Sequence, residues 1–278
     1  MPRFNAGMAF DLARGRTVLF GGGGGGGFLA DTWEWDGNEW TQTADMGPTG
    51  RDAHAVAYDS NRQRTVLFGG SGTNGDLADT WEWDGREWTQ IADTGPVAQR
   101  FPAVAFDSKR GLVVLFGGGN TWVWDGNEWT QEQDTGPGAR ATPILAYDTI
   151  RDRVILFGGA SRAGFLNDTW EYDGTQWTQV ADTGPSPRTF HRIIYDGANV
   201  LLFGGFNADV DPVSVFGDTW AWDGKRWTQL QDIGPARQQF GMTYDTVRKR
   251  AILFGGSRKD LGLGGDTWEW FDHSLPAP

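Results

Sequence analysis

Six copies of one pattern dominate this sequence of 278 residues. Each copy has an apolar run ending in Phe-Gly-Gly, first at Val18–Gly22, and an Asp/Asn-Thr-Trp triplet, first at Asp31–Trp33. Successive triplets are 48, 41, 48, 50 and 48 residues apart. A fixed period of this length is typical of solenoids and propellers, in which each repeat buries its core against its neighbours. The repeat runs nearly end to end, so it predicts a single domain.

The run of seven glycines, Gly21–Gly27, belongs to this repeat. The second copy reads FGGSGTNGDLAD where the first reads FGGGGGGGFLAD, at the same length. A phosphate loop needs a Gly-Lys-Ser/Thr ending that opens a helix, whose amides hold the anion. Here Phe28 follows the glycines. The run therefore indicates a loop, and a nucleotide site is disfavoured.

Charge and cysteine content exclude several classes of function. The net charge is -12, and 21 of the 36 acidic residues are aspartates in the repeated strand-end and turn columns, where Asp bonds its own backbone. Nucleic-acid binding is disfavoured because it needs a basic face. Cysteine is absent, which excludes disulfides, thiolate metal ligands and cysteine nucleophiles.

The chain carries no obvious targeting signal. Its start, MPRFNAGMAF, lacks the apolar core of a signal peptide, and no segment approaches the roughly 20 apolar residues that span a bilayer. We therefore expect a soluble, uncleaved chain with no membrane partner. The compartment is not specified, although the missing signal favours the cytoplasm.

Each repeat contains four segments of strand length separated by turn residues. In the second copy these are 53–59, 64–70, 79–84 and 87–91, rich in β-branched and aromatic residues. The Trp-Asp-Gly turn is a hairpin signal, and a Gly-Pro pair marks the passage to the next repeat. No helical periodicity is present. Four strands per repeat predict an all-β propeller of six four-stranded antiparallel blades, at about 3–46, 47–94, 95–135, 136–183, 184–233 and 234–272.

All 16 tryptophans fall in the third and fourth strand segments. Regular columns of large rings are what neighbouring blades need to pack face to face, because each ring buries on the order of 150 to 250 Å². We expect the tryptophans to form the core between blades, with stacking on carbohydrate as the alternative.

The chain resembles the kelch-repeat β-propellers. The resemblance rests on the Phe-Gly-Gly ending strand two, the aromatic third strand, the Trp of strand four about 20 residues later, and the Arg-x-x-His-like opening RDAHAVAYD. It covers roughly residues 3–270. It implies a six-bladed kelch-type propeller in which strand one lines a central channel. The loops from strand two to three and from strand four to the next strand one then surround a binding mouth.

Two copies depart from the pattern. Blade three runs from Phe116 to Asn120 through three glycines, so its loop is missing and that side of the mouth should be open. The sixth copy has no Trp-Thr-Gln strand after Trp270. Either the last blade has three strands, or the chain is a piece of a longer product.

An arginine column stands eight residues before the Asp that ends strand one. Five copies have Arg at this position and the third has Gln99. Such regularity indicates a repeated structural bond to carbonyls or to a neighbouring Asp. Arg140 and Arg237 of this column are nevertheless kept among the candidate ligand-binding residues.

The next two columns vary between blades, and variable positions on a rigid frame are where recognition is placed. Arg192 is a lone charge where other copies have Gly, Ala or Ile, and period-two alternation directs it into the channel. A buried, unpaired guanidinium is costly, so it should meet a carboxylate, carbonyls, water or an anionic ligand. The candidate channel-mouth residues are Asn5, His54, Phe101, Arg140, Phe190, His191, Arg192, Arg237, Gln239 and Phe240.

No catalytic or metal-binding cluster is predicted. His54 and His191 belong to opposite blades, His273 lies in the tail, and no ligand spacing is present. The copper oxidases built on kelch propellers use a crosslinked cysteine, which this chain lacks. We therefore expect no cofactor and no metal.

Three functions remain open. The favoured one is a monomeric, non-catalytic scaffold that binds a peptide, protein or small ligand at the mouth. The second is an enzyme, such as a sugar-modifying or metal-assisted lyase or isomerase, with His54 or His191 as general base beside an arginine. The third is a spacer within a larger protein.

Overall fold

The computed structural model describes residues 1–132, 136–209, 214–232, 234–258 and 262–270. Over these ranges the chain forms strands, turns and loops. It contains no helix of the length and apolarity that a membrane crossing requires.

Five four-stranded antiparallel sheets and one three-stranded sheet form the blades. From the inside outward, the first three are β1 (Gly7–Asp11), β2 (Arg16–Phe20), β5 (Thr32–Trp35) and β6 (Trp40–Ala44); β8 (Ala55–Asp59), β9 (Arg64–Phe68), β12 (Thr80–Trp83) and β13 (Trp88–Ala92); and β14 (Ala103–Asp107), β15 (Leu112–Gly117), β16 (Asn120–Trp124) and β17 (Trp129–Gln131). The others are β18 (Leu145–Asp148), β19 (Arg153–Ser161), β20 (Gly164–Tyr172) and β21 (Trp177–Ala181); β22 (Arg192–Tyr195), β23 (Val200–Phe203), β26 (Thr219–Trp222) and β27 (Trp227–Gln231); and β28 (Gly241–Asp245), β29 (Arg250–Phe254) and β32 (Thr267–Trp270).

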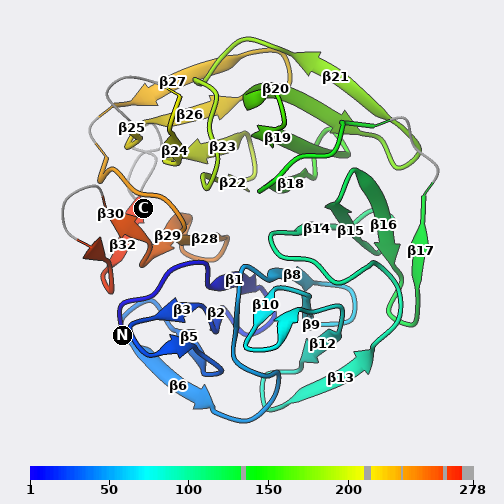
Figure 1. Ribbon diagram of the computed structural model, residues 1–278, viewed down its shortest axis with the longest axis vertical. Helices are drawn as coiled ribbons and strands as arrows, with labels where there is room; N and C mark the ends of the chain where they lie inside the picture. The colour runs from blue at the N-terminus through cyan, green and yellow to red at the C-terminus, as the bar shows by residue number, and fades with distance from the viewer. Residues whose placement is uncertain (133–135, 210–213, 233, 259–261, 271–278) are drawn as a thin grey trace.

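The sheets are arranged radially around a common centre (Figure 1), where strand one of each blade lines a cavity. Each innermost strand contacts the innermost strands of two neighbours, in the order β1, β8, β14, β18, β22, β28 and back to β1. The fold is therefore an all-β propeller with strand one of each repeat at the centre, as the sequence predicted.

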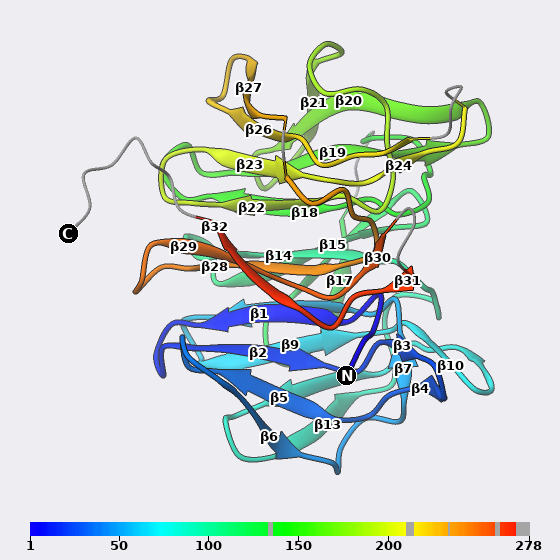
Figure 2. The same ribbon diagram turned by 90° about the vertical axis from the view of Figure 1, so that its left-hand side faces the viewer.

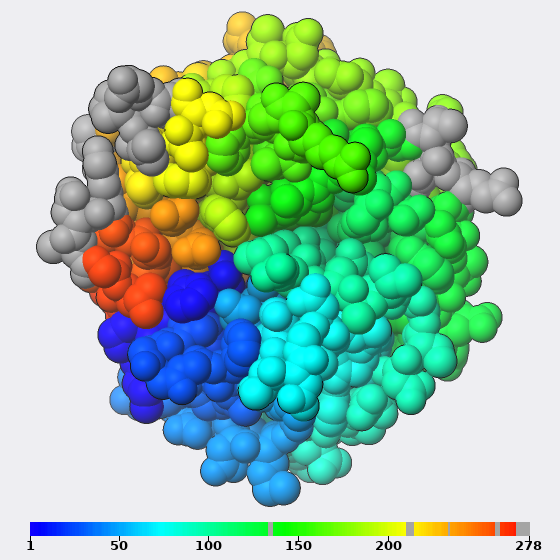
Figure 3. All heavy atoms as spheres, viewed as in Figure 1, coloured from blue at the N-terminus to red at the C-terminus, as the bar shows by residue number. Residues whose placement is uncertain are grey.

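Small hairpins gather on one face of the ring (Figure 2). They include β3 (Gly23–Gly24) with β4 (Gly27–Phe28), β10 (Ser71–Gly72) with β11 (Gly75–Asp76), β24 (Phe206–Asn207) with β25 (Ser214–Val215), and β30 (Ser257–Arg258) with β31 (Gly262–Leu263). Most pair with the segment just before strand one of their own blade, as β10 does with β7 (Arg51–Asp52). Figure 3 looks onto this loop-bearing face. The last five of the seven glycines lie in the β3–β4 hairpin, whereas blade three turns directly from Gly117 to Asn120.

A repeated three-residue contact holds neighbouring blades together. A fourth-strand Trp packs on the Phe that ends strand two of the preceding blade, with ring centroids 5.2 to 5.7 Å apart. Its indole N–H donates to the Thr directly before the first Trp of strand three there, at 2.8 or 2.9 Å. Burying the ring and satisfying its N–H together explains the tryptophan column. The five sets are Trp88/Phe20/Thr32, Trp129/Phe68/Thr80, Trp177/Phe116/Thr121, Trp227/Phe157/Thr169 and Trp40/Phe254/Thr267.

The arginine column ties five of the blades to their own loops. Arg51 donates to both carboxylate oxygens of Asp79 and to the Gly69 carbonyl, and the indole of Trp81 donates to the same carboxylate. The Arg–Asp pair recurs at Arg3–Asp31, Arg140–Asp168, Arg188–Asp218 and Arg237–Asp266. The structure thus confirms the repeated bond. In blade three both partners are replaced, by Gln99 and Asn120, so no buried charge is left without its counterion.

Blade one meets blade six through the Trp–Phe–Thr set that four other boundaries share. Trp40 reaches Phe254 and Thr267, and Arg248 donates to the carbonyl of Asp36. A cavity of about 120 Å³ adjoins Trp40 and Trp33 at this boundary. The ring therefore closes through side-chain packing and through backbone hydrogen bonds, such as that from the Arg3 amide to the Gly264 carbonyl. Blade six shows three strands within the described ranges.

A candidate ligand site in the central channel

Six residues in the left-handed backbone conformation form a ring at the mouth of the channel. We call them the ring of left-handed residues. One residue per blade, two positions before strand one or nearby, has φ between 51° and 61° although none is glycine. A non-glycine residue in this region is uncommon, and six at one repeated position mark a specific backbone turn. The six are Asn5, Ala53, Phe101, Thr142, Phe190 and Gln239.

Backbone hydrogen bonds join most of this ring from blade to blade. The amides of Asn5, Ala53 and Phe101 each donate to the same position of the preceding blade, at 3.1 Å or less. The Gln239 amide does likewise to Phe190. The chain of bonds is interrupted at Thr142, whose amide and carbonyl make no such bond among the described residues. Its hydroxyl is buried and has no partner there either. The mouth is thus an open ring with polar groups at the gap.

Phe101 and Phe190 meet across this gap. Their ring centroids are 5.4 Å apart in an edge-to-face arrangement, and both side chains are partly exposed. They come from blades three and five, so they reach over the Thr142 position of blade four. Together they place an apolar surface at the mouth, beside the blade that lacks its hairpin.

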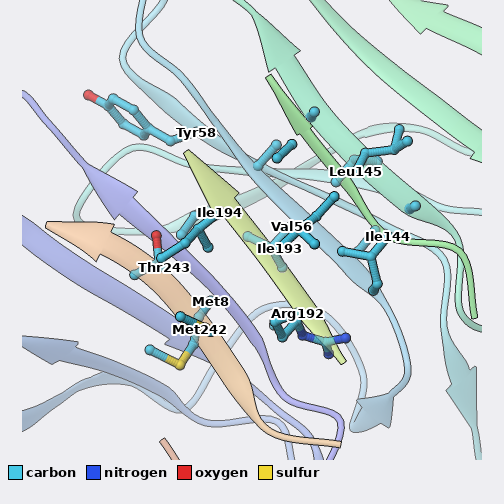
Figure 4. Close-up of a pocket in the computed structure, with 18 of the residues that line it drawn as sticks. Met8, Val56, Tyr58, Ile144, Leu145, Arg192, Ile193, Ile194, Met242 and Thr243 are labelled. Carbon is cyan, nitrogen blue, oxygen red and sulfur yellow. The ribbon is translucent and has the colours of Figure 1, made fainter. Parts of the chain in front are cut away.

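A cavity of about 350 Å³ fills the channel below the mouth. Strand one of every blade contributes to its wall, which is largely Ala, Val, Ile, Leu, Met and aromatic side chains. Figure 4 shows Met8, Val56, Ile144, Arg192 and Met242 around this space. Its size lies at the lower end of the range for small-molecule sites.

Arg192 is the one formally charged residue among the described residues that line the cavity. Its Nη1 donates to the His191 carbonyl at 3.3 Å, and no carboxylate of the described residues lies within salt-bridge distance. Burial lowers the pKa of Arg192 to about 10, so the side chain is still a cation at neutral pH. The predicted position in the channel agrees with the structure.

His54, His191 and Phe240 are not free ligand-binding groups at the mouth, contrary to their place among the candidates. Each ring packs edge-on against the Phe of the preceding blade, namely Phe20, Phe157 and Phe203 respectively. Each follows a residue in the left-handed conformation, whereas Ala6, Pro102 and Pro143 of the same column line the cavity. His191 and Phe240 are fully buried, whereas His54 is 7% exposed and lines the cavity.

Burial holds both of these histidines neutral. It lowers the pKa of His54 and that of His191 to about 3, and the positive charges of Arg51 and Arg188 respectively add to the effect. A base of this strength has little driving force to accept a proton near neutral pH. The positive charge of Arg192 also lowers the pKa of both histidines.

Of the remaining candidates, two form structural ion pairs and two belong to the ring of left-handed residues. Arg140 and Arg237 are nearly or fully buried and pair with Asp168 and Asp266, so they do not line the cavity. Asn5 is 4% exposed and donates to Asp52 at 3.4 Å. Gln239 occupies the ring of left-handed residues and is partly exposed.

Within the described ranges no three His, Cys, Asp or Glu side chains are grouped so that they could hold a metal ion. His273 lies outside the described residues. Residues that the candidate list did not contain also shape the site, above all Thr142 and Ile144. Thr142 stands in the variable column, but the sequence has no signal for a broken backbone ring.

Comparison with known proteins agrees with this architecture. No curated protein matches the sequence. The solved structure titled "Structure of YjhT" has a TM-score of 0.79 and 14% identity, and the match covers 98% of this chain and 96% of that one. At such identity the likeness shows the fold alone. The family model described as the KLHDC2/KLHL20/DRC7 Kelch-repeats domain matches residues 121–270, more than half of the chain. This protein therefore belongs to that family of Kelch-repeat propellers.

Proposed function

We propose that this propeller is a scaffold that binds a peptide, protein or small ligand at the loop-bearing mouth without altering it. The Phe101–Phe190 pair carries the proposal. Two partly exposed aromatic rings stand over the channel, in a column whose backbone repeats six times while its side chains differ. Exposed rings on a rigid frame are typical anchors for recognition.

The enzyme alternative is supported less well. It required His54 or His191 as a general base, and both rings are packed between blades with a pKa near 3. We therefore propose no reaction, no cofactor and no metal for the mouth. A monomer remains our proposal for the oligomeric state, and the cytoplasm for the location.

The test is a binding selection with matched variants. A displayed library of random peptides is passed over the wild-type protein, Phe101→Ala, Phe190→Ala and the control Ile150→Ala, and native mass spectrometry screens the same proteins for a copurifying compound. Ile150 is 73% exposed in the turn between β18 and β19, away from the mouth. We expect Phe101→Ala and Phe190→Ala to weaken recovery or retention at least tenfold, with unchanged unfolding midpoints.

The control should behave as wild type. Ligands that bind all four proteins equally would place recognition elsewhere on the molecule. Failure of the wild type to retain any peptide or compound would also contradict the proposal.

A further inference from the structure

The outer edge of blade six is open within the described part of the chain. Strand β32 pairs with β29 on one side, and no described strand pairs with its other side. Each of the other five blades has its fourth strand at this position. The N–H and C=O groups along the outer edge of β32 are therefore left for another strand to pair with. β32 lies on the side of the ring that faces the viewer in Figure 2.

Trp268 shows what the missing strand leaves uncovered. It is 47% exposed, whereas the equivalent tryptophan of every complete blade is less exposed. The sequence of β32, Thr-Trp-Glu-Trp, contains neither the lysine nor the proline that commonly protects an edge strand from pairing. The edge therefore offers both backbone hydrogen bonds and an apolar surface. The equivalent tryptophans are Trp33, Trp81, Trp122, Trp170 and Trp220.

Thr219 is a second, independent sign of a missing partner. At five blade boundaries the corresponding Thr accepts a hydrogen bond from the fourth-strand indole of the next blade. Thr219 of blade five is the sixth member of this column, and the strand that would carry its donor belongs to blade six. It is 5% exposed, and no described residue forms a hydrogen bond with its hydroxyl. A nearly buried acceptor that is not used marks a place for an N–H donor.

The five complete blades show which sequence fits such an edge. Their fourth strands all begin with Trp-Thr-Gln. In blade two, Trp88 lies opposite Trp83, the last residue of strand three, and Gln90 lies opposite Trp81. A strand that joins β32 in the same register sets its own Trp opposite Trp270. The repeat geometry then directs the indole N–H to Thr219.

One contact has to change when an indole enters. In the linker after blade one, Gly47 lies against the fourth-strand Trp88 of the next blade. Gly234, its counterpart after blade five, lies against the ring of Phe203 instead. A bound indole takes this place on Phe203, so Gly234 has to move outward. The cost of this movement lowers the affinity, and we expect weak binding for a short segment.

We propose that the open edge of blade six binds an extended segment of another polypeptide, which joins β32 as an antiparallel fourth strand and places a tryptophan at Thr219. A second copy is a poor donor, because its described fourth strands are paired within its own blades. The sixth repeat itself has Leu275 at the position of this Trp, followed by Pro276. Leucine has no indole and proline has no amide hydrogen. The site is separate from the mouth and does not depend on the proposed function.

The probe is a peptide with the sequence of residues 86–92, REWTQIA, acetylated and amidated at its ends, because this segment contains the start of the fourth strand of blade two. Calorimetry measures its binding to the full-length protein, and hydrogen exchange measures protection of the β32 amides. We expect saturable binding with a Kd below about 1 mM, and slower exchange in β32. The same peptide with Trp88→Ala should bind at least about tenfold more weakly.

Thr219→Val in the protein removes the acceptor and keeps the shape of the side chain. It should weaken the peptide about three- to tenfold, the value of one net hydrogen bond. Thr130→Val is the matched control, because Thr130 is exposed on β17 of blade three. Thr130→Val and Phe190→Ala, which tests the mouth, should both bind the peptide as wild type does. The unfolding midpoint of each variant shows that the fold is retained.

Three results would overturn this inference. The first is no binding at about 1 mM peptide. The second is equal binding after Trp88→Ala in the peptide or Thr219→Val in the protein. The third is full protection of the β32 amides before any peptide is added: native mass spectrometry would then assign the edge to a second copy if the protein is a dimer, and to the chain itself if it is a monomer.

Discussion

Trp40 donates its indole N–H to Thr267 Oγ1 at 2.8 Å, across 227 positions of the chain. This bond is one of several contacts that join the first blade to the last. It repeats the contact that Trp129 makes with Thr80 between blades three and two. The closing boundary therefore uses the same chemistry as boundaries whose blades are consecutive in the chain.

The two equivalent bonds should differ in strength because their surroundings differ. Thr80→Val leaves a fully buried indole N–H without an acceptor, which costs about 1 to 3 kcal/mol. At Trp40 the bond is partly buried beside the 120 Å³ cavity, so water can replace the hydroxyl. We expect Thr267→Val to cost less than about 1 kcal/mol in urea unfolding. A larger loss for Thr267→Val would show that the closing contact limits the stability of the ring.

The Arg51–Asp79 pair should be tolerant of joint replacement and intolerant of single replacement. Arg51 is fully buried and Asp79 is 19% exposed. Burial raises the pKa of Asp79, but the hydrogen bonds from Arg51 and Trp81 outweigh it and lower that pKa. Arg51→Gln or Asp79→Asn alone should each cost about 3 kcal/mol, since a buried charge is left unpaired.

The double variant reproduces the pair found in blade three, Gln99 with Asn120. It should cost at least about 1 kcal/mol less than the sum of the single changes, measured by a double-mutant cycle in urea. Additive losses would mean that the two side chains act independently.

Acid should destabilise the fold at pH values well above those at which carboxylates titrate, because two buried histidines have lowered pKa values. The folded pKa of His191, about 3, lies below the ordinary value of about 6.5, so the unfolded state binds more protons between these limits. Stability therefore falls as the pH drops from about 6.5 toward 3, and by pH 5 each of the two buried histidines removes about 2 kcal/mol.

His191→Phe tests this, because Phe240 already fills the same position in blade six. Urea unfolding at about pH 7.5 and pH 5 should show roughly half the wild-type loss in the variant. An unchanged loss would mean that other groups titrate in this window.

The propeller fold could be predicted from the sequence because its structural residues recur in six copies of the repeat. The arginine column, the tryptophan columns and the turn residues repeat, so each supported the same interpretation. The structure then adds their partners, such as Asp79 for Arg51 and Thr32 for Trp88.

The candidate site was harder to predict, because its residues are those that differ from one copy of the repeat to the next. Period-two alternation placed Arg192 in the channel, and the structure agrees. The variable columns also placed His191 and Phe240 among the candidates at the mouth, but each follows a residue in the left-handed conformation, and its ring packs against the Phe of the preceding blade. Phe, Thr, Gln and Asn in that conformation give no local signal, because glycine is the residue that usually announces it.

In the ring of left-handed residues, the backbone conformation does not depend on which side chain is present. Asn, Ala, Phe, Thr and Gln all occupy this one backbone position in neighbouring blades of the same molecule. The blades therefore already display which exchanges the scaffold accepts. Exchanging these side chains among the six positions would change the proposed recognition surface while leaving the Trp–Phe–Thr sets between blades in place.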